Sequence, residues 1–195
     1  DGRAVVYDSE RGGIWSIYES EMVNDKEPVM TYCTEIKERL LTDGVTTSFQ
    51  PLYSPDGKKV AYLQNREAVC IMDLKSGKTK VAMDAKYNYS YSDGDQYFTW
   101  SPDSKWLLAD YMGNGGWNNV DVALIDAEGK DEPVNLTQSG YTDSHARWVM
   151  GGKAMIFASD RAGYRSHGSW GSHRDVYITF FDTEAYNKFR MNKED

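Results

Sequence analysis

The stretch from residue 161 to residue 175 holds the densest set of chemically useful side chains in this sequence. Two aromatic residues offer flat contact surfaces, two arginines can pair with carboxylates, and two of the three histidines can donate hydrogen bonds. These residues are Tyr164, Trp170, Arg165, Arg174, His167 and His173. We interpret the stretch as a binding loop. The alternative is a loop that folds over the structure and packs its aromatic residues inward.

Two shorter stretches add further candidates for binding. The stretch from Gly113 to Asn119 combines glycines and amide side chains with Trp117. Aromatic planes beside amides suit the peptide backbone and sugar hydroxyls equally well, so both ligand classes stay open. Asp143 and His145, where the segment from Ser139 to Ser144 ends, complete the set of candidate binding residues.

Three familiar patterns of catalytic or metal chemistry are not matched. Gly168-Ser169-Trp170-Gly171 is not a Gly-x-Ser-x-Gly elbow and lacks the strand-to-helix context that exposes a nucleophile. His167 and His173 have no cysteine or carboxylate between them at metal-ligand spacing, which argues against zinc. Asp93-Gly94-Asp95 lacks the later ligands of a calcium loop. We therefore predict no catalytic residue, no metal and no cofactor in this chain.

A repeated turn indicates how these loops are held. Ser54-Pro55-Asp56-Gly57 has the residues of a tight reverse turn, and it recurs as Ser101-Pro102-Asp103-Ser104. A degenerate copy runs from Val149 to Gly152, and half a copy runs from Asp1 to Arg3. Each copy precedes an apolar segment. A period of roughly 40 to 50 residues with several short strands is typical of propeller blades.

The repeat predicts an all-β fold: a partial β-propeller ring of about four blades, each a four-stranded antiparallel sheet. The predicted units, all in one domain, are a partial first blade with an insertion (1–44), a blade (45–86), a blade (87–140), a last blade with a long loop (141–191) and the start of a linker (192–195). The first blade lacks its innermost strand. Because propeller rings usually close with more blades, we expect a fragment of a longer protein. A dimer that completes one ring is the alternative.

Apolar segments between turn residues predict the strands. In the first repeat they are Ala4–Asp8, Ile14–Tyr18, Val29–Tyr32 and Glu38–Thr42. In the second they are Phe49–Tyr53, Lys59–Leu63, Ala68–Asp73 and Thr79–Met83. In the last two they are Gln96–Trp100, Trp106–Asp110, Val120–Asp126, Pro133–Thr137, Ala146–Val149, Ala154–Ser159 and Asp175–Phe181, followed by a short helix over Glu184–Arg190. This order places the long loops together on one face of the ring.

Composition excludes some classes of partner. The net charge of −8 and a pI near 4.9 argue against nucleic acid and anionic membranes, which both need a basic surface. The sequence has no run of about 18 apolar residues, so it predicts no transmembrane span. Cys33 and Cys70 fall in different predicted repeats, which favours two buried thiols over a disulfide.

The repeat resembles a known family. A Ser-Pro-Asp-Gly/Ser turn between a strand that ends in an aromatic residue and an apolar strand resembles the TolB-like, WD-like propeller repeat over most of the chain. The stretch from Ala158 to Gly171, continued by Asp175-Val176-Tyr177 and Phe180-Phe181-Asp182, resembles the end of the N-terminal propeller of tricorn-like serine peptidases from Bacteroides-type bacteria. No residue here matches the catalytic serine of that family or its partners.

The resemblance implies a function and a setting. In such peptidases the propeller precedes a second propeller, a PDZ-like module and the catalytic domain, and the propellers guide peptide substrates. We therefore expect a non-catalytic propeller segment that binds peptide or protein ligands and contacts the remaining blades and the catalytic domain of its parent. The resemblance also implies a periplasmic or exported location. The alternatives are a TolB-like scaffold for protein–protein interaction and a sugar-binding propeller.

Overall fold

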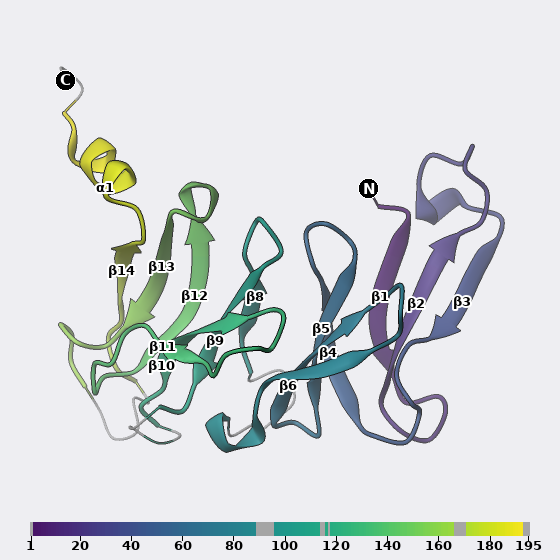
Figure 1. Cartoon of the computed structure of the whole chain (residues 1–195), viewed down its shortest axis with the longest axis horizontal. Helices are drawn as coiled ribbons and strands as arrows, with labels where there is room; N and C mark the ends of the chain where they lie inside the picture. Colours follow the sequence, from purple (N-terminus) through teal and green to yellow (C-terminus); the bar gives the residue numbers. More distant parts are fainter. Residues whose placement is uncertain (1, 89–95, 114–115, 117, 166–170, 193–195) are drawn as a thin grey trace.

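The chain folds into four antiparallel sheets that follow one another in an arc (Figure 1). The structure is a computed structural model, and it describes residues 2–88, 96–113, 116, 118–165 and 171–192. We call the sheets blades 1 to 4, in chain order. Blades 2 and 3 have four strands each, and blades 1 and 4 have three in the described residues. This is the predicted all-β architecture of a partial β-propeller.

Blade 1 contains β1 (Ala4–Ser9), β2 (Ser16–Met22) and β3 (Ile36–Leu40). The strand predicted at Val29–Tyr32 is wrong: Met30–Tyr32 form one turn of 3-10 helix, and Tyr32 is 77% exposed. The physical reason is that β3 pairs directly with β2, so the intervening segment serves as the connection between these two strands and not as a strand itself. Cys33 follows this turn and is only partly buried, so the prediction of a buried thiol is wrong there.

Blade 2 is the most regular sheet. Its strands are β4 (Ser48–Tyr53), β5 (Lys59–Gln64), β6 (Ala68–Asp73) and β7 (Thr79–Met83). They pair in chain order, with short turns between them. The two central strands are almost continuously buried, because a neighbouring blade covers each face of the sheet. Cys70 lies inside β6 and is fully buried, as predicted.

Blade 3 repeats this arrangement, and blade 4 departs from it at its end. Blade 3 consists of β8 (Phe98–Trp100), β9 (Trp106–Tyr111), β10 (Asp121–Asp126) and β11 (Val134–Asn135). Blade 4 consists of β12 (Asp143–Val149), β13 (Ala154–Ser159) and β14 (Asp175–Phe180). Helix α1 (Thr183–Arg190) then takes the place of a fourth strand. The helix begins here because the Asp182 carboxylate caps it by accepting a hydrogen bond from the Ala185 N–H.

The repeated turns have the chemistry that their sequence predicts. In the first, the Ser54 hydroxyl donates to the Asp56 carboxylate at 2.6 Å and accepts from the Lys59 N–H at 3.0 Å. The second has the same pair of bonds around Ser101. Gly57 closes the first turn with φ +68°, a conformation that glycine adopts without strain.

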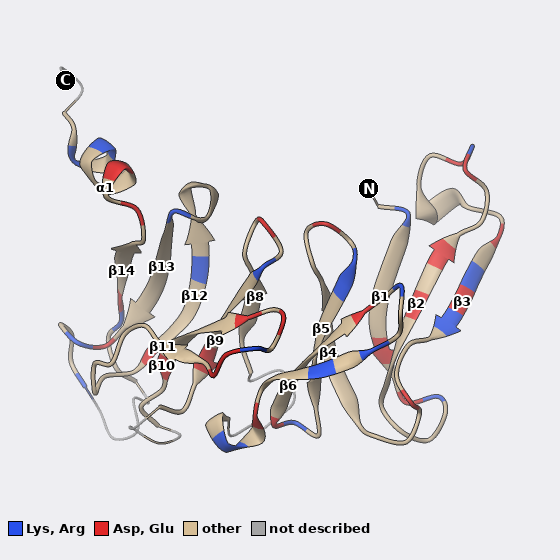
Figure 2. Cartoon of the chain, viewed as in Figure 1, with Lys and Arg blue, Asp and Glu red and all other residues tan. Residues whose placement is uncertain are grey.

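Hydrophobic contacts between blades form the core. One cluster joins blades 2 and 3, a second joins blades 3 and 4, and a third joins blades 1 and 2. Figure 2 shows charged residues concentrated in turns, in loops and on β2 and β3 of blade 1, whereas β13 carries none. Each blade is therefore stabilised by stacking on its neighbours rather than by a core of its own.

The connections divide between two faces of the arc. The turns between the first and second strands of blades 2, 3 and 4 lie along the upper edge in Figure 1, which we call the turn face. The segments that link one blade to the next, and the segment between β13 and β14, lie along the opposite edge, the loop face. Most of the candidate binding residues belong to segments at the loop face.

Candidate functional site

A buried carboxylate anchors the loop face where blade 4 begins. Asp143 is the first residue of β12 and is fully buried. Arg161 donates to its Oδ2 atom at 2.7 Å, and the Ser139 hydroxyl donates to the same atom at 2.6 Å. Its Oδ1 atom has no hydrogen-bond partner among the described residues. Asp143 therefore fixes two loop segments rather than facing a ligand from the surface.

A second buried carboxylate, Asp160, holds the next arginine. Asp160 directly follows β13, is fully buried and accepts a hydrogen bond from the Thr142 N–H at 3.0 Å. Arg165 lies 3.3 Å from its Oδ2 atom and donates to the Asn119 side chain at 2.9 Å. The Arg165 guanidinium also lies over the Tyr141 ring, 5.0 Å from its centroid. This arginine is held by three partners, which favours a positioning role.

The third cluster gathers at a bulge in β12. The bulge places His145 at φ +57°, and its N–H donates to the Asp110 carboxylate at 2.8 Å. The His145 ring packs on the Tyr97 ring with centroids 5.0 Å apart. Arg174, just before β14, donates to the Ser144 hydroxyl at 3.1 Å and remains exposed to solvent.

This cluster has unusual electrostatics. Burial raises the pKa of Asp110 to about 7, although the His145 N–H and the charge of Arg174 both lower it. Burial and the positive charges of Arg174 and Arg147 lower the pKa of His145. At neutral pH the imidazole is therefore largely uncharged, and Asp110 is only partly ionised. Arg174 then supplies an exposed positive charge beside the packed rings of His145 and Tyr97.

Ser144, His145 and Asp110 do not form a catalytic triad. The hydroxyl of Ser144 and the carboxylate of Asp110 both approach the same ring nitrogen, Nδ1, at 3.1 and 3.8 Å. A triad needs the two groups on opposite nitrogens, so that one nitrogen takes the proton from serine while the carboxylate holds the N–H of the other and orients the ring. Ser144 is also buried. This arrangement is suited to recognition and not to nucleophilic attack.

The two ends of the segment between β13 and β14 lie close together. The His173 N–H donates to the Tyr164 carbonyl oxygen at 2.9 Å, and the two rings lie 6.1 Å apart. A Cβ atom on Gly163 would lie 2.5 Å from the His173 carbonyl oxygen, so this close approach requires glycine. Tyr164 is 65% exposed. The loop base is thus fixed, and it presents an aromatic ring to solvent.

The structure brings together most of the predicted site residues. Arg165, Arg174, His173, Tyr164, Asp143 and His145 all lie on the loop face around the start of blade 4. His167, Trp170 and Trp117 lie outside the described residues. Sequence reasoning missed three contributors: Asp110, Asp160 and Arg161. One signal for Asp110 was available, because this acid interrupts the apolar run that begins at Trp106.

The fold is shared with several solved structures. A putative TolB from Agrobacterium tumefaciens matches with a TM-score of 0.57 and 17% identity, over 92% of this chain and 63% of that one. Tricorn protease matches with a TM-score of 0.65 and 14% identity, over 91% and 17% of the two chains. A puromycin hydrolase complexed with PGG matches with a TM-score of 0.60 and 13% identity, over 92% and 26%. No protein family model matches the chain.

These likenesses confirm the fold that the sequence resemblance implies. The chain has the β-propeller fold of TolB, which also occurs in tricorn-type peptidases. It spans less than two thirds of the length of each of these proteins. At such low identity the comparison establishes the fold alone.

Two further observations concern the described residues. None of their helices is both long enough and apolar enough to cross a membrane. Nor do three or more histidine, cysteine or acidic side chains gather there in a way that would hold a metal ion.

Proposed function

We propose that this chain is a non-catalytic segment of a peptidase-type parent protein, and that its loop face binds peptide or protein substrates. The observation that carries the proposal is the exposed group of Tyr164, His145 and Arg174 above two buried carboxylate–arginine pairs. Similarity to the folds of tricorn protease and of prolyl endopeptidases supports a peptidase-type parent.

The chemistry of the group suits a peptide. Aromatic rings bind apolar side chains and the flat faces of peptide bonds, and an exposed guanidinium binds carboxylates or backbone carbonyl oxygens. The buried ion pairs hold the loop ends in one geometry before the ligand arrives, which lowers the entropic cost of binding. The remaining blades and a catalytic domain of the parent would complete the path of the substrate. An exported location belongs to the same proposal. A dimer that completes the ring is the alternative to completion by the remaining blades of the parent.

A binding titration tests the proposal. The probe is a pool of fluorescein-labelled decapeptides of mixed sequence, and its fluorescence anisotropy is followed as the chain is added. We expect binding without cleavage. Arg174→Ala and Tyr164→Ala should each weaken binding by about five- to thirtyfold, as interface anchors typically do. Lys188→Ala, on the exposed side of α1, is the matched control and should bind as the unmodified chain does. Equal binding by all four proteins would overturn the assignment of the site.

A TolB-like protein-interaction scaffold is the second candidate. This chain matches a larger share of the TolB chain than of the peptidase chains, which favours a scaffold. A scaffold would bind a folded protein through a broad surface and would ignore short peptides. Absence of peptide binding, together with retained binding of a folded partner in the Arg174→Ala variant, would favour it.

A further inference from the structure

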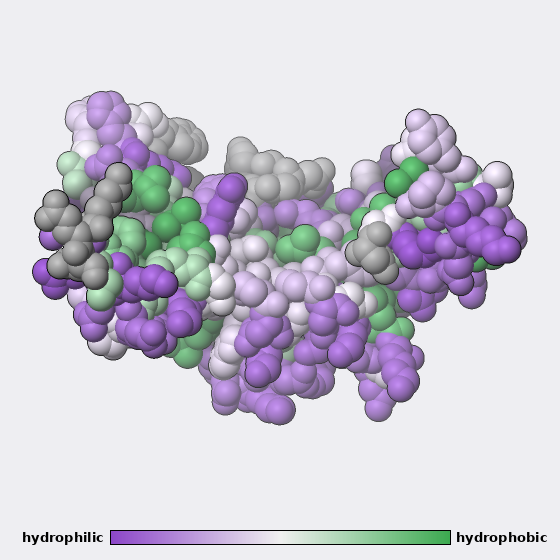
Figure 3. Space-filling model, turned by 90° about the horizontal axis from the view of Figure 1, so that it is seen from above, coloured by the Kyte–Doolittle hydropathy of each residue, from purple (hydrophilic) through white to green (hydrophobic). Residues whose placement is uncertain are grey.

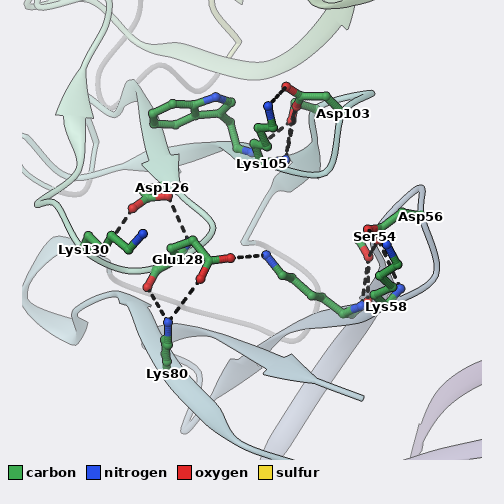
Figure 4. A network of polar contacts seen from close by, with 12 residues as sticks. Ser54, Asp56, Lys58, Lys80, Asp103, Lys105, Asp126, Glu128 and Lys130 are labelled. Atoms are coloured by element: carbon green, nitrogen blue, oxygen red, sulfur yellow. Dashed lines mark hydrogen bonds and ion pairs between the residues drawn. The ribbon is translucent and has the colours of Figure 1, made fainter. Parts of the chain in front are cut away.

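Neighbouring blades 2 and 3 are sealed on the turn face by ion pairs. Glu128, in the turn after β10, lies 2.6 Å from the Lys59 Nζ atom and 3.4 Å from the Lys80 Nζ atom (Figure 4). Lys80 also donates to the Glu128 carbonyl oxygen at 2.9 Å. A further bond joins the two repeated turns, from the Asp56 N–H to the Ser104 hydroxyl at 3.0 Å. The gap between these two blades is thereby closed with charged side chains.

The same three positions between blades 3 and 4 carry different residues. Strand register defines the equivalence: Lys59 pairs with Asp73, Trp106 with Asp126, and Ala154 with Phe180. By this register, Trp106 replaces Lys59, Val134 replaces Lys80 and Asp182 replaces Glu128.

Asp182 cannot seal the second gap as Glu128 seals the first. Its carboxylate accepts the hydrogen bond from the Ala185 N–H at 2.7 Å and so caps α1. An indole and an aliphatic side chain now occupy the positions of the two lysines, so an ion pair between these positions is lost. Ion pairs therefore close the gap between blades 2 and 3, whereas the gap between blades 3 and 4 stays open and apolar.

The open gap is a cleft of about 490 Å3. Its walls are largely apolar: Pro102, Trp106, Leu124, Trp148 and Phe181 line it, with Gly151 and Gly152 at one side. Trp106 is 37% exposed and Phe181 is 43% exposed. Figure 3 looks onto the turn face and shows hydrophobic residues gathered over the end of the molecule that carries β12 to β14. Clefts of this size and polarity are typical of ligand sites.

The charges around the cleft determine what fits. Asp103, at its edge, accepts hydrogen bonds from the Ser101 hydroxyl at 2.6 Å and the Lys105 N–H at 3.2 Å. The Lys105 Nζ atom lies 4.0 Å from the same carboxylate. With Asp182 held as a helix cap, both carboxylates are compensated within the chain. The cleft therefore complements an uncharged group, because a buried charge would find no partner there.

The cleft between blades 1 and 2 provides a contrast on the same face. It measures about 730 Å3, and its lining mixes apolar residues such as Tyr53, Pro55 and Leu74 with six charged ones, among them Arg39 and Lys58. An apolar side chain placed there would strip water from several charged groups, which is costly. Among the described residues, Asp103 is the one charged residue that lines the cleft between blades 3 and 4, so its nearly uncharged lining distinguishes it from the cleft between blades 1 and 2.

We infer that the cleft between blades 3 and 4 binds a neutral aromatic side chain of a partner polypeptide. Two indole rings and a phenyl ring offer flat walls for stacking, and the rim carries no uncompensated charge among the described residues. The site lies on the turn face, opposite the peptide site proposed above, so it does not depend on that proposal. It would anchor a segment of that partner polypeptide against this end of the propeller.

Fluorine NMR tests this inference. The six tryptophans are replaced by 5-fluorotryptophan, and resonances are assigned from single Trp→Phe variants. The probe is N-acetyl-phenylalaninamide, with N-acetyl-lysinamide as the charged counterpart. We expect the Trp106 and Trp148 resonances to shift with a dissociation constant on the order of 1 mM, the affinity of an efficient small ligand. The Trp15 resonance should not move.

Two variants and a control make the outcome decisive. Trp106→Lys restores the residue type of the sealed gap, and Phe181→Ala opens one wall; each should weaken the response of Trp148 by about tenfold or more. Both positions are partly exposed, so the fold should survive. Tyr32→Ala, an exposed aromatic residue of blade 1, should leave the titration unchanged. The inference is overturned if the two tryptophans do not respond, if the lysine probe shifts them equally, or if Trp106→Lys binds as before.

Discussion

The indole N–H of Trp100 donates to the backbone carbonyl oxygen of Leu52 at 3.0 Å, and so ties the first strand of blade 3 to the first strand of blade 2. The bond is repeated one blade later, where the Trp148 indole approaches the Thr99 carbonyl oxygen at 3.4 Å. At the equivalent place in blade 2, Tyr53 donates instead to the Glu19 carboxylate at 2.7 Å. In the described residues β1 is an edge strand of blade 1, so no further strand offers a backbone carbonyl oxygen at this place. The side chain of Glu19 supplies the acceptor instead.

Replacing Trp100 with phenylalanine should destabilise the fold. Trp100 is 6% exposed, and the substitution removes a hydrogen bond and leaves unfilled volume in the cluster between blades 2 and 3. We expect a loss of about 1–3 kcal/mol in the free energy of unfolding, measured in urea. Trp148→Phe is the matched comparison and should cost less, because its bond is longer and its ring is only partly buried. Equal losses in the two variants would contradict this account.

Asp110 should make stability depend on pH in a direction unusual for a carboxylate. Its pKa is about 7 in the folded chain, against about 3.9 for an unperturbed aspartate, so the folded state holds the proton more tightly. Stability should therefore fall as pH rises from about 4 to about 7 and then level off. His145 acts in the opposite sense: its lowered pKa means that stability is gained as pH rises towards about 6.5.

The Asp110→Asn variant isolates this contribution. An asparagine still accepts the hydrogen bond from the His145 N–H but does not titrate. The difference in unfolding free energy between the variant and the unmodified chain should change by on the order of 2–4 kcal/mol between pH 4 and pH 8, with the variant favoured at high pH. Urea titrations at several pH values measure it. A difference that does not vary with pH would show that Asp110 is ionised in the folded state throughout.

The strands that sequence patterns predicted best are those that turn residues bracket on both sides. The predicted bounds of β6, β7 and β13 agree with the structure to the residue. The pattern failed in β2, which continues through Glu19 and Glu21 to Met22, because these acidic residues mask a strand in which Glu21 alone is exposed. Here burial comes from the neighbouring blade and not from the hydrophobic pattern alone.

The sequence predicted where the candidate site lies, but not which side chains pair with one another within it. Loop length and composition located the loop face and residues such as Arg165 and Arg174. The partners of the arginines were not visible, because Asp160 lies outside the predicted loop and the Asp143–Arg161 pair spans two segments that only the sheet brings together. The bulge that turns His145 towards Asp110 is a register shift between β12 and β13, which a single sequence does not encode in any recognisable pattern.

The two cysteines should react at very different rates. Burial raises the pKa of Cys70 to about 11, and its side chain is inaccessible inside β6, so it stays a protonated thiol. Cys33 is partly exposed and lies outside the sheets. We expect one rapidly titrating thiol with Ellman's reagent at pH 8, and a second only after unfolding in urea. The rapid phase should vanish in Cys33→Ser. Two rapid thiols in the native chain would contradict the burial of Cys70.

The ion pairs of Glu128 should contribute modestly and in a salt-dependent way. Lys59 is the more buried partner, with 19% of its side chain exposed, while Glu128 is 46% exposed, so solvent screens much of the attraction. Glu128→Gln should cost about 0.2–1 kcal/mol at low ionic strength and close to nothing in molar salt. The hydrogen bond from Lys59 lowers the pKa of Glu128, so its contribution is present above about pH 4.3 and is lost as pH falls through the lowered value. Glu10→Gln, an exposed acid of blade 1, is the control. If both variants lose the same stability at low and high salt, the gap between blades 2 and 3 is closed by packing, and the contrast with the apolar cleft beside it would no longer rest on charge.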